Sequence, residues 1–115
     1  MGIRSEVALA IKNEAYINLT DESKETIRDW LGEYRDRNED GMLFVNDGIK
    51  WYYDMISELV ALYQDLAEQD DEDYYILVAT PEYVEDNGGD IGGWYNNPWY
   101  VEKNVSVEIY YEGKY

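Results

Sequence analysis

The sequence predicts an α+β domain, a two-layer sandwich with two helices on one face of a mainly antiparallel, four-stranded sheet, in the order β-α-β-α-β-β. Two observations lead to this fold class. Apolar and polar residues alternate near both ends of the chain, as in strands, and apolar residues recur at intervals of three and four in two stretches between them, as in helices. With 115 residues, 45% of them hydrophobic, the chain can bury one modest core, so we expect a single domain over residues 1–115.

Residues 3–12 are expected to form the first strand. Its buried face carries Ile3, Ser5, Val7, Leu9 and Ile11. The other face has Ala8 and Ala10, whose small side chains indicate partial cover on that side as well. Residues 13–19 fit either a short helical turn or an irregular link.

A first helix is expected from the N-cap Thr20 to about residues 37–40, with Gly41 as the exit. Its apolar stripe consists of Ile27, Trp30, Leu31 and Tyr34. Its polar face mixes acidic and basic residues, so we interpret it as an ordinary solvated surface.

The apolar pattern of residues 42–51 predicts a second strand. Its apolar face carries Leu43, Val45, Ile49 and Trp51. The sequence Asn46-Asp47-Gly48 could form a hairpin turn that splits this stretch. We favour a single strand with a bulge or kink at Gly48.

A second helix is expected from its N-cap Asp54 to about Asp70. Its apolar stripe consists of Ile56, Leu59, Val60, Tyr63, Leu66 and Ala67. At about 100° per residue, five carboxylates fall within roughly 40° of one line on the opposite side, with no basic residue among them. We call this set the acidic ridge: Asp54, Glu58, Asp65, Glu68 and Glu72.

The rest of the chain is expected to form a central strand at 74–80, a long loop at 81–98 and a last strand at 99–112. We expect one core under both helices, made of the apolar residues that fall on the buried faces of the predicted helices and strands. They are Val7, Leu9, Ile11, Trp30, Leu31, Leu59, Tyr63, Ile76, Val105 and Val107.

The net charge is −17, and residues 51–102 contain no Lys, Arg or His. Such a surface repels nucleic acid and anionic membranes and attracts basic protein surfaces. We therefore expect a basic, nucleic-acid-binding protein as the partner, with no direct nucleic-acid or membrane binding. The expected partner-binding residues are Asp54, Glu58, Asp65, Glu68, Asp70, Asp71, Glu72, Asp73, Glu82, Glu85, Asp86, Trp94 and Tyr95.

Two alternatives stay open for these residues. The acidic ridge could mimic a nucleic-acid backbone, or it could be a charged face that only keeps the protein soluble. Trp94 and Tyr95 could anchor a partner or a small ligand, because aromatic residues dominate binding hot spots, whereas Trp99 and Tyr100 of the same stretch could simply enter the last strand and the core.

Catalysis and metal binding are not expected. The chain has no His and no Cys, and it shows no glycine-rich phosphate loop, although a carboxylate pair of the glycosidase type is compatible with its composition. Residues 85–90 (EDNGGD) offer oxygen ligands, but their spacing does not match an EF-hand loop. We expect no metal and no cofactor.

The N-terminus lacks the apolar stretch of a signal peptide, so we expect a soluble protein of the cytoplasm. The sequence leaves homo-oligomerisation open.

Three short segments resemble a group of small tailed-phage proteins: residues 1–7 (MGIRSEV), 49–52 (IKWY) and 73–77 (DYYIL). The group usually begins Met-Gly-Tyr-Arg-Ser-x-Val, and the chain departs from it at Ile3 and in the glycine-rich loop. The resemblance implies a phage origin, and hence interference with a host system, but no functional residue carries over from it.

We therefore expect a non-catalytic phage inhibitor that occupies the nucleic-acid-binding surface of a host defence protein, in the manner of a DNA mimic. A CRISPR–Cas effector or a restriction enzyme is the expected target class. The alternative is a structural or accessory interaction protein that inhibits nothing and whose charge serves solubility.

Overall fold

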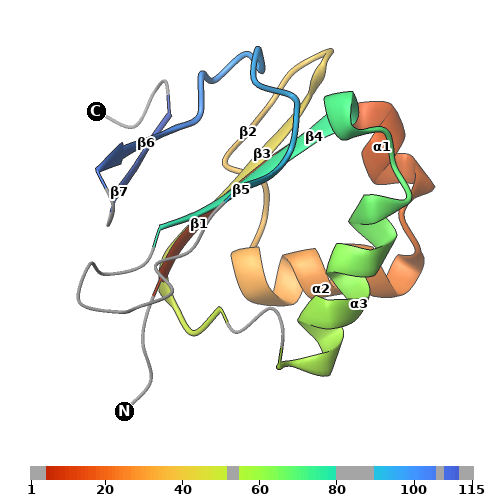
Figure 1. Ribbon diagram of the computed structural model, residues 1–115. Coiled ribbons are helices and arrows are strands. Elements are labelled where there is room, and N and C mark those ends of the chain that lie inside the picture. Colours follow the sequence, from red (N-terminus) through yellow and green to blue (C-terminus); the bar gives the residue numbers. More distant parts are fainter. Residues whose placement is uncertain (1–4, 52–54, 80–89, 106–107, 112–115) are drawn as a thin grey trace.

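The chain folds around a five-stranded antiparallel sheet with the strand order β2-β3-β1-β4-β5 (Figure 1). The computed structural model describes residues 5–51, 55–79, 90–105 and 108–111, with the backbone alone for residues 90, 102–105, 108 and 110. The strands of this sheet are β1 (Ser5–Lys12), β2 (Asp36–Arg37), β3 (Gly41–Ile49), β4 (Tyr74–Ala79) and β5 (Asp90–Gly92).

The other elements of the described residues are three helices, a 3-10 helix and a separate two-stranded sheet. They are α1 (Asn13–Asn18), α2 (Asp21–Leu31), α3 (Ser57–Ala67), η1 (Asp71–Asp73), β6 (Glu102–Val105) and β7 (Glu108–Tyr110). The α+β class and the antiparallel sheet are as predicted, whereas α1, β2 and β5 add a helix and two short strands to the predicted set.

The sheet is covered on both faces (Figure 1). The helices pack on one face, where Val7, Leu9 and Ile11 of β1 belong to a helix-side core. The C-terminal segment packs on the opposite face, where Ala8 and Ala10 belong to a second, C-terminal core with Trp94, Trp99 and Ile109. Both alanines are 0% exposed, so cover at this strand is complete rather than partial.

The first long helix begins as predicted and ends earlier. Thr20 is the N-cap of α2, and its hydroxyl oxygen accepts a hydrogen bond from the Ser23 backbone N–H at 3.1 Å. The helix stops at Leu31 because Gly32 adopts φ +82°, a left-handed conformation that favours glycine. The predicted end at residues 37–40 is therefore wrong, and residues 36–37 form β2 instead.

Strand β3 is single, with the predicted irregularity at Gly48. Its register with β1 skips this residue, because Ser5 pairs with Ile49 and Glu6 with Asp47, and Gly48 has φ +109°. One extra residue reverses the alternation of faces. Leu43 and Val45 consequently lie in the C-terminal core, whereas Trp51 lies in the helix-side core, so the predicted common face is divided.

Residues 99–112 were predicted to form one strand of the main sheet, but they contain two short strands of a separate sheet. Residues of this stretch form β6 and β7, which pair antiparallel with each other, with Lys103 opposite Ile109. An alternation of apolar and polar residues looks the same in one long strand and in two paired strands. Trp99 and Val101, before β6, belong to the C-terminal core, and Trp99 is 3% exposed.

Most of the predicted core is confirmed. Six of the predicted residues are buried in the helix-side core, namely Val7, Leu9, Ile11, Leu31, Leu59 and Ile76. Trp30 and Tyr63 are partly buried and pack against it. The Val105 side chain and Val107 lie outside the described residues. The C-terminal core lies on the face for which only partial cover was predicted, and its residues were not among the predicted core.

A glycine at the start of β3 lets this strand pack closely against the Ile11 backbone of β1 and the Trp94 ring. A Cβ atom on Gly41 would collide with the Ile11 carbonyl oxygen and lie 2.8 Å from the Trp94 ring. We predict that Gly41→Ala lowers the free energy of unfolding by about 1–3 kcal/mol. Gly93→Ala is the matched control, because its Cβ would come no closer than 3.4 Å to another atom. Urea unfolding of both variants measures the difference, and an unchanged Gly41→Ala midpoint would contradict the tight packing.

Candidate functional site

The acidic ridge of the sequence is not continuous in the structure. Helix α3 begins at Ser57 with Ile56 as its N-cap, and Asp54 lies outside the described residues. Glu58 and Glu68 are exposed, but Asp65 between them is only 9% exposed. The apolar face of α3 is made by Leu59, Leu62 and Leu66, and Asp65 lies beside it rather than opposite it.

Asp65 connects α3 to the beginning of α2. Its Oδ2 accepts a hydrogen bond from the Thr20 backbone N–H at 2.9 Å, across 45 residues of sequence. Thr20 in turn caps α2 through Ser23. The buried Asp65 carboxylate therefore fixes the N-terminus of α2 against α3. This structural role places Asp65 between the two helices, where it also lines a groove.

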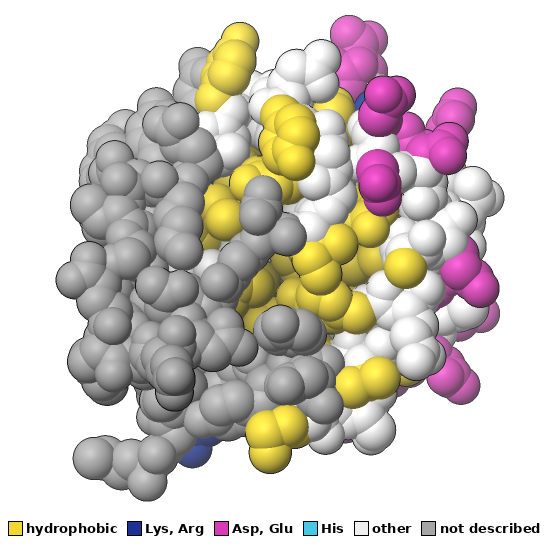
Figure 2. Space-filling model, in the orientation of Figure 1, with side chains coloured by type: hydrophobic (Ala, Val, Ile, Leu, Met, Phe, Trp, Pro, Cys, Tyr) yellow, Lys and Arg dark blue, Asp and Glu magenta, His cyan; other side chains and the backbone are white. Residues whose placement is uncertain are grey.

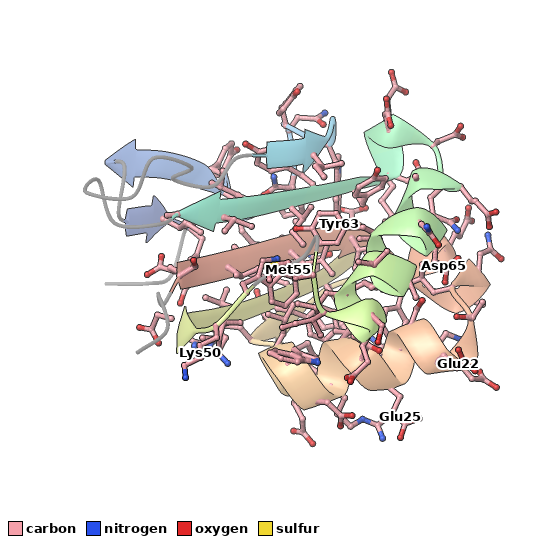
Figure 3. The ribbon with its side chains drawn as sticks, turned by 60° about the horizontal axis from the view of Figure 1, so that its bottom comes forward. Glu22, Glu25, Lys50, Met55, Tyr63 and Asp65 are labelled. Atoms are coloured by element: carbon pink, nitrogen blue, oxygen red, sulfur yellow. The ribbon has the colours of Figure 1, made fainter. Side chains whose placement is uncertain are left out.

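A groove of about 480 Å³ runs between α2 and α3, and we call it the acidic groove. Six of its lining residues carry carboxylates: Glu22, Glu25, Asp29, Glu58, Asp65 and Glu68. Its other lining residues are neutral, and no Lys or Arg is among them. Figure 3 shows Glu22 and Glu25 on α2 and Asp65 on α3. Like charges on both walls leave this groove without internal neutralisation.

Helix α2 supplies half of these acids, although its sequence mixes both signs. At about 100° per residue, Glu22, Glu25 and Asp29 fall on one flank of the helix and Lys24 and Arg28 on the other. The acidic flank faces α3, whereas the other flank carries Asp21 together with its two basic residues and therefore has the mixed charge that was predicted. A helical projection of the sequence contains this division, but the location of α3 does not follow from it.

The acids continue past the end of α3. Asp70, Asp71 and Glu72 are exposed, and Asp73 forms an ion pair with Lys12 at 3.3 Å. Figure 2 shows Asp and Glu side chains along the edge of the molecule where the helices lie, beside an apolar area at the centre of the view. Glu82, Glu85 and Asp86 lie outside the described residues.

The two aromatic candidates occupy different environments. Trp94 is 5% exposed, with its ring edge-to-face against Trp99 at 6.1 Å and Lys12 Nζ 5.7 Å from the ring centroid. It is part of the C-terminal core and presents little surface to a partner. Tyr95 is 65% exposed and packs edge-on against Tyr75, which leaves it accessible.

No cluster of three or more potential metal ligands is found among the described residues. Residues 85–89 of the glycine-rich loop lie outside them, and Asp90 begins β5. Within the same part of the chain, no helix has the length and apolar character needed to cross a membrane.

Comparison with known proteins gives no matching family model, no matching curated protein and no matching solved structure.

The link between the helices gives a first test of this site. Replacing Asp65 by Ala leaves the Thr20 N–H without its acceptor, and we expect a loss of about 1–3 kcal/mol in the free energy of unfolding. Asp70→Ala removes an exposed carboxylate just beyond the helix and should change stability by less than about 0.5 kcal/mol. Chemical denaturation of the two variants side by side decides the matter. Equal stability would mean that Asp65 contributes only charge.

The acidic segment also affects a buried phenol. Burial, together with the negative charge of Asp71, raises the pKa of Tyr74 above its usual value. Tyrosine in the unfolded chain ionises near pH 10, whereas the folded chain keeps this proton to a higher pH. The free energy of unfolding should therefore fall as the pH rises above about 10, and Tyr74→Phe should make that fall shallower. Denaturation curves across this range measure both slopes, and identical slopes would contradict the shift.

Proposed function

We propose that this protein binds a basic, nucleic-acid-binding surface of a host defence protein through the acidic groove and thereby excludes nucleic acid from that surface. The observation that carries the proposal is the lining of the groove, six carboxylate residues on two facing helices with no basic residue among them. The resemblance to small phage proteins supplies the reason to look for the partner in a bacterial host, with a CRISPR–Cas effector or a restriction enzyme as the target class.

The arrangement suits Lys and Arg side chains better than a flat acidic surface would. A cation that enters the groove has carboxylates on α2 at one side and on α3 at the other, and the neutral residues Ser23, Thr26 and Gln64 can accept or donate hydrogen bonds between them. Asp70, Asp71 and Glu72 extend the negative field beyond the groove. Such a field speeds association with a positive surface and opposes association with phosphates.

Self-repulsion is the main physical argument that the charge has a use beyond solubility. Like charges gathered on neighbouring helices lower stability, and a net charge of −17 is more than solubility requires of a small domain. Acids spread over the whole surface would give the same solubility with less repulsion. Their concentration along α2 and α3 is what a basic partner would require.

A charge-removal variant tests the proposal. Glu22→Gln, Glu25→Gln, Asp29→Asn and Glu68→Gln together remove four exposed groove charges and leave Asp65 and the Glu58–Trp30 hydrogen bond in place. We expect proteins captured from bacterial lysate by the parent at low salt, and lost at high salt, to include one nucleic-acid-binding protein. The groove variant should bind that protein at least about tenfold more weakly, a difference of about 1.4 kcal/mol. It should also fail to displace labelled DNA from it.

A matched control separates the groove from net charge. Glu14→Gln, Glu33→Gln, Glu39→Gln and Asp47→Asn remove the same number and kind of exposed carboxylates outside the groove, so both variants carry −17 + 4 = −13. The proposal requires the control to bind and to displace DNA as the parent does. If both variants bind like the parent, the charge serves solubility, and the accessory role becomes the better account.

A further inference from the structure

A second groove, of about 580 Å³, lies on the other flank of α2. It is bounded by α1, the end of α2, the segment that leads into β2, and β3, and we call it the arginine groove. The residues that matter for its chemistry are Tyr16, Ile17, Arg28, Tyr34, Arg37 and Phe44. The inference below does not depend on the function proposed for the acidic groove.

The chain has 26 acids for 9 basic residues, yet two arginine side chains of this groove have no partner among the described residues. Within that part of the chain, neither the Arg28 nor the Arg37 guanidinium group has a hydrogen bond or an ion pair, and both residues are exposed. Three other basic residues there are engaged: Lys12 pairs with Asp73, Lys24 Nζ lies 5.8 Å from the Tyr16 ring centroid, and Arg35 donates to the Tyr111 hydroxyl at 2.7 Å. Two free guanidinium groups from different elements therefore line one groove, and guanidinium matches phosphate geometry closely.

Half of the lining residues of the groove are apolar or aromatic. Tyr16 stacks on Phe44 with ring centroids 5.8 Å apart, which makes a firm floor. Tyr34 is 49% exposed and Ile17 is 67% exposed, so both present accessible apolar surface beside the arginines. A planar ring can stack on such a surface, as nucleic-acid bases do on exposed aromatic side chains. The volume lies within the range of ordinary small-molecule sites.

We propose that the arginine groove binds a nucleoside monophosphate, with the phosphate between Arg28 and Arg37 and the base against Tyr34 and Ile17. Glu33 is the one carboxylate among the lining residues of the groove. Together with a net charge of −17, it disfavours a densely charged triphosphate. The groove should therefore prefer a monophosphate to a triphosphate, the reverse of a site selected by positive charge alone.

The test is an NMR titration of the full chain with AMP, ATP, adenosine and inorganic phosphate. AMP should shift the backbone amides of Gly32, Glu33 and Tyr34, and adenosine or phosphate alone should bind at least about tenfold more weakly. Arg28→Gln and Arg37→Gln should each weaken AMP binding by roughly tenfold. Lys50→Gln removes the same charge at an exposed position after β3 and should leave AMP binding unchanged (Figure 3).

Glu33→Gln tests the selectivity separately. It should strengthen ATP binding more than AMP binding, because it removes the charge that opposes the outer phosphates. Circular dichroism melting of all variants establishes that these exposed substitutions leave the fold intact.

The proposal is wrong if millimolar AMP causes no amide shifts, or if the shifts map away from the groove. It is also wrong if both arginine variants bind AMP with the affinity of the parent. A dimer in sedimentation equilibrium that Arg28→Gln dissociates would also overturn it, because a second copy of the chain would then be the occupant.

Discussion

The structure depends on a central strand that is buried on both faces. Residues 7–11 of β1 are all 0% exposed, between β3 and β4 within the sheet and between two cores above and below it. A strand of this kind requires a second cover, and the tryptophans of the C-terminal segment provide it. Small residues at Ala8 and Ala10 leave the volume that these large rings occupy. The domain consequently has three layers: the helices, the sheet and the C-terminal segment. Two layers would have been enough for a sheet with one apolar face.

The same constraint decides where the charge can lie. With both faces of the sheet covered, the exposed carboxylates of the described residues lie on the helices, in the connecting segments and at outer strand positions such as Asp36 and Asp47. Asp65 is the one buried carboxylate among the described acids, and its hydrogen bond to Thr20 compensates its burial. The acidic groove and the arginine groove then lie on opposite flanks of α2, so one helix separates surfaces of opposite chemical preference.

The sequence predicted those features of the fold that depend on interactions between residues close together in the chain. The alternation in β1, the cap at Thr20 and the irregularity at Gly48 each depend on neighbouring residues, and the structure has all of them. The end of α2 was placed at Gly41 rather than at Gly32, because the left-handed conformation of Gly32 cannot be read from the sequence.

The candidate site was less predictable, because it depends on contacts between distant residues. A helical projection places Asp65 near Glu58 and Glu68, but the N–H group that binds Asp65 belongs to a residue 45 positions away. The acids of α2 became part of a site only when α3 packed beside them. Trp94 lies in a stretch rich in aromatic and turn residues, which suggested a surface anchor. It is buried because the C-terminal segment covers the second face of the sheet.

The length of the outer strands has a consequence for the protein at high concentration. A sheet whose middle is so apolar would be an effective template for pairing with other chains if its borders were long. In the described residues the borders are β2, with two residues, and β5, with three. β2 consists of Asp36 and Arg37, and the Asp36 carboxylate is held by the indole N–H of Trp99 at 2.8 Å. These two outer strands themselves offer another chain little backbone with which to pair, so pairing at β2 or β5 is resisted by geometry as well as by charge.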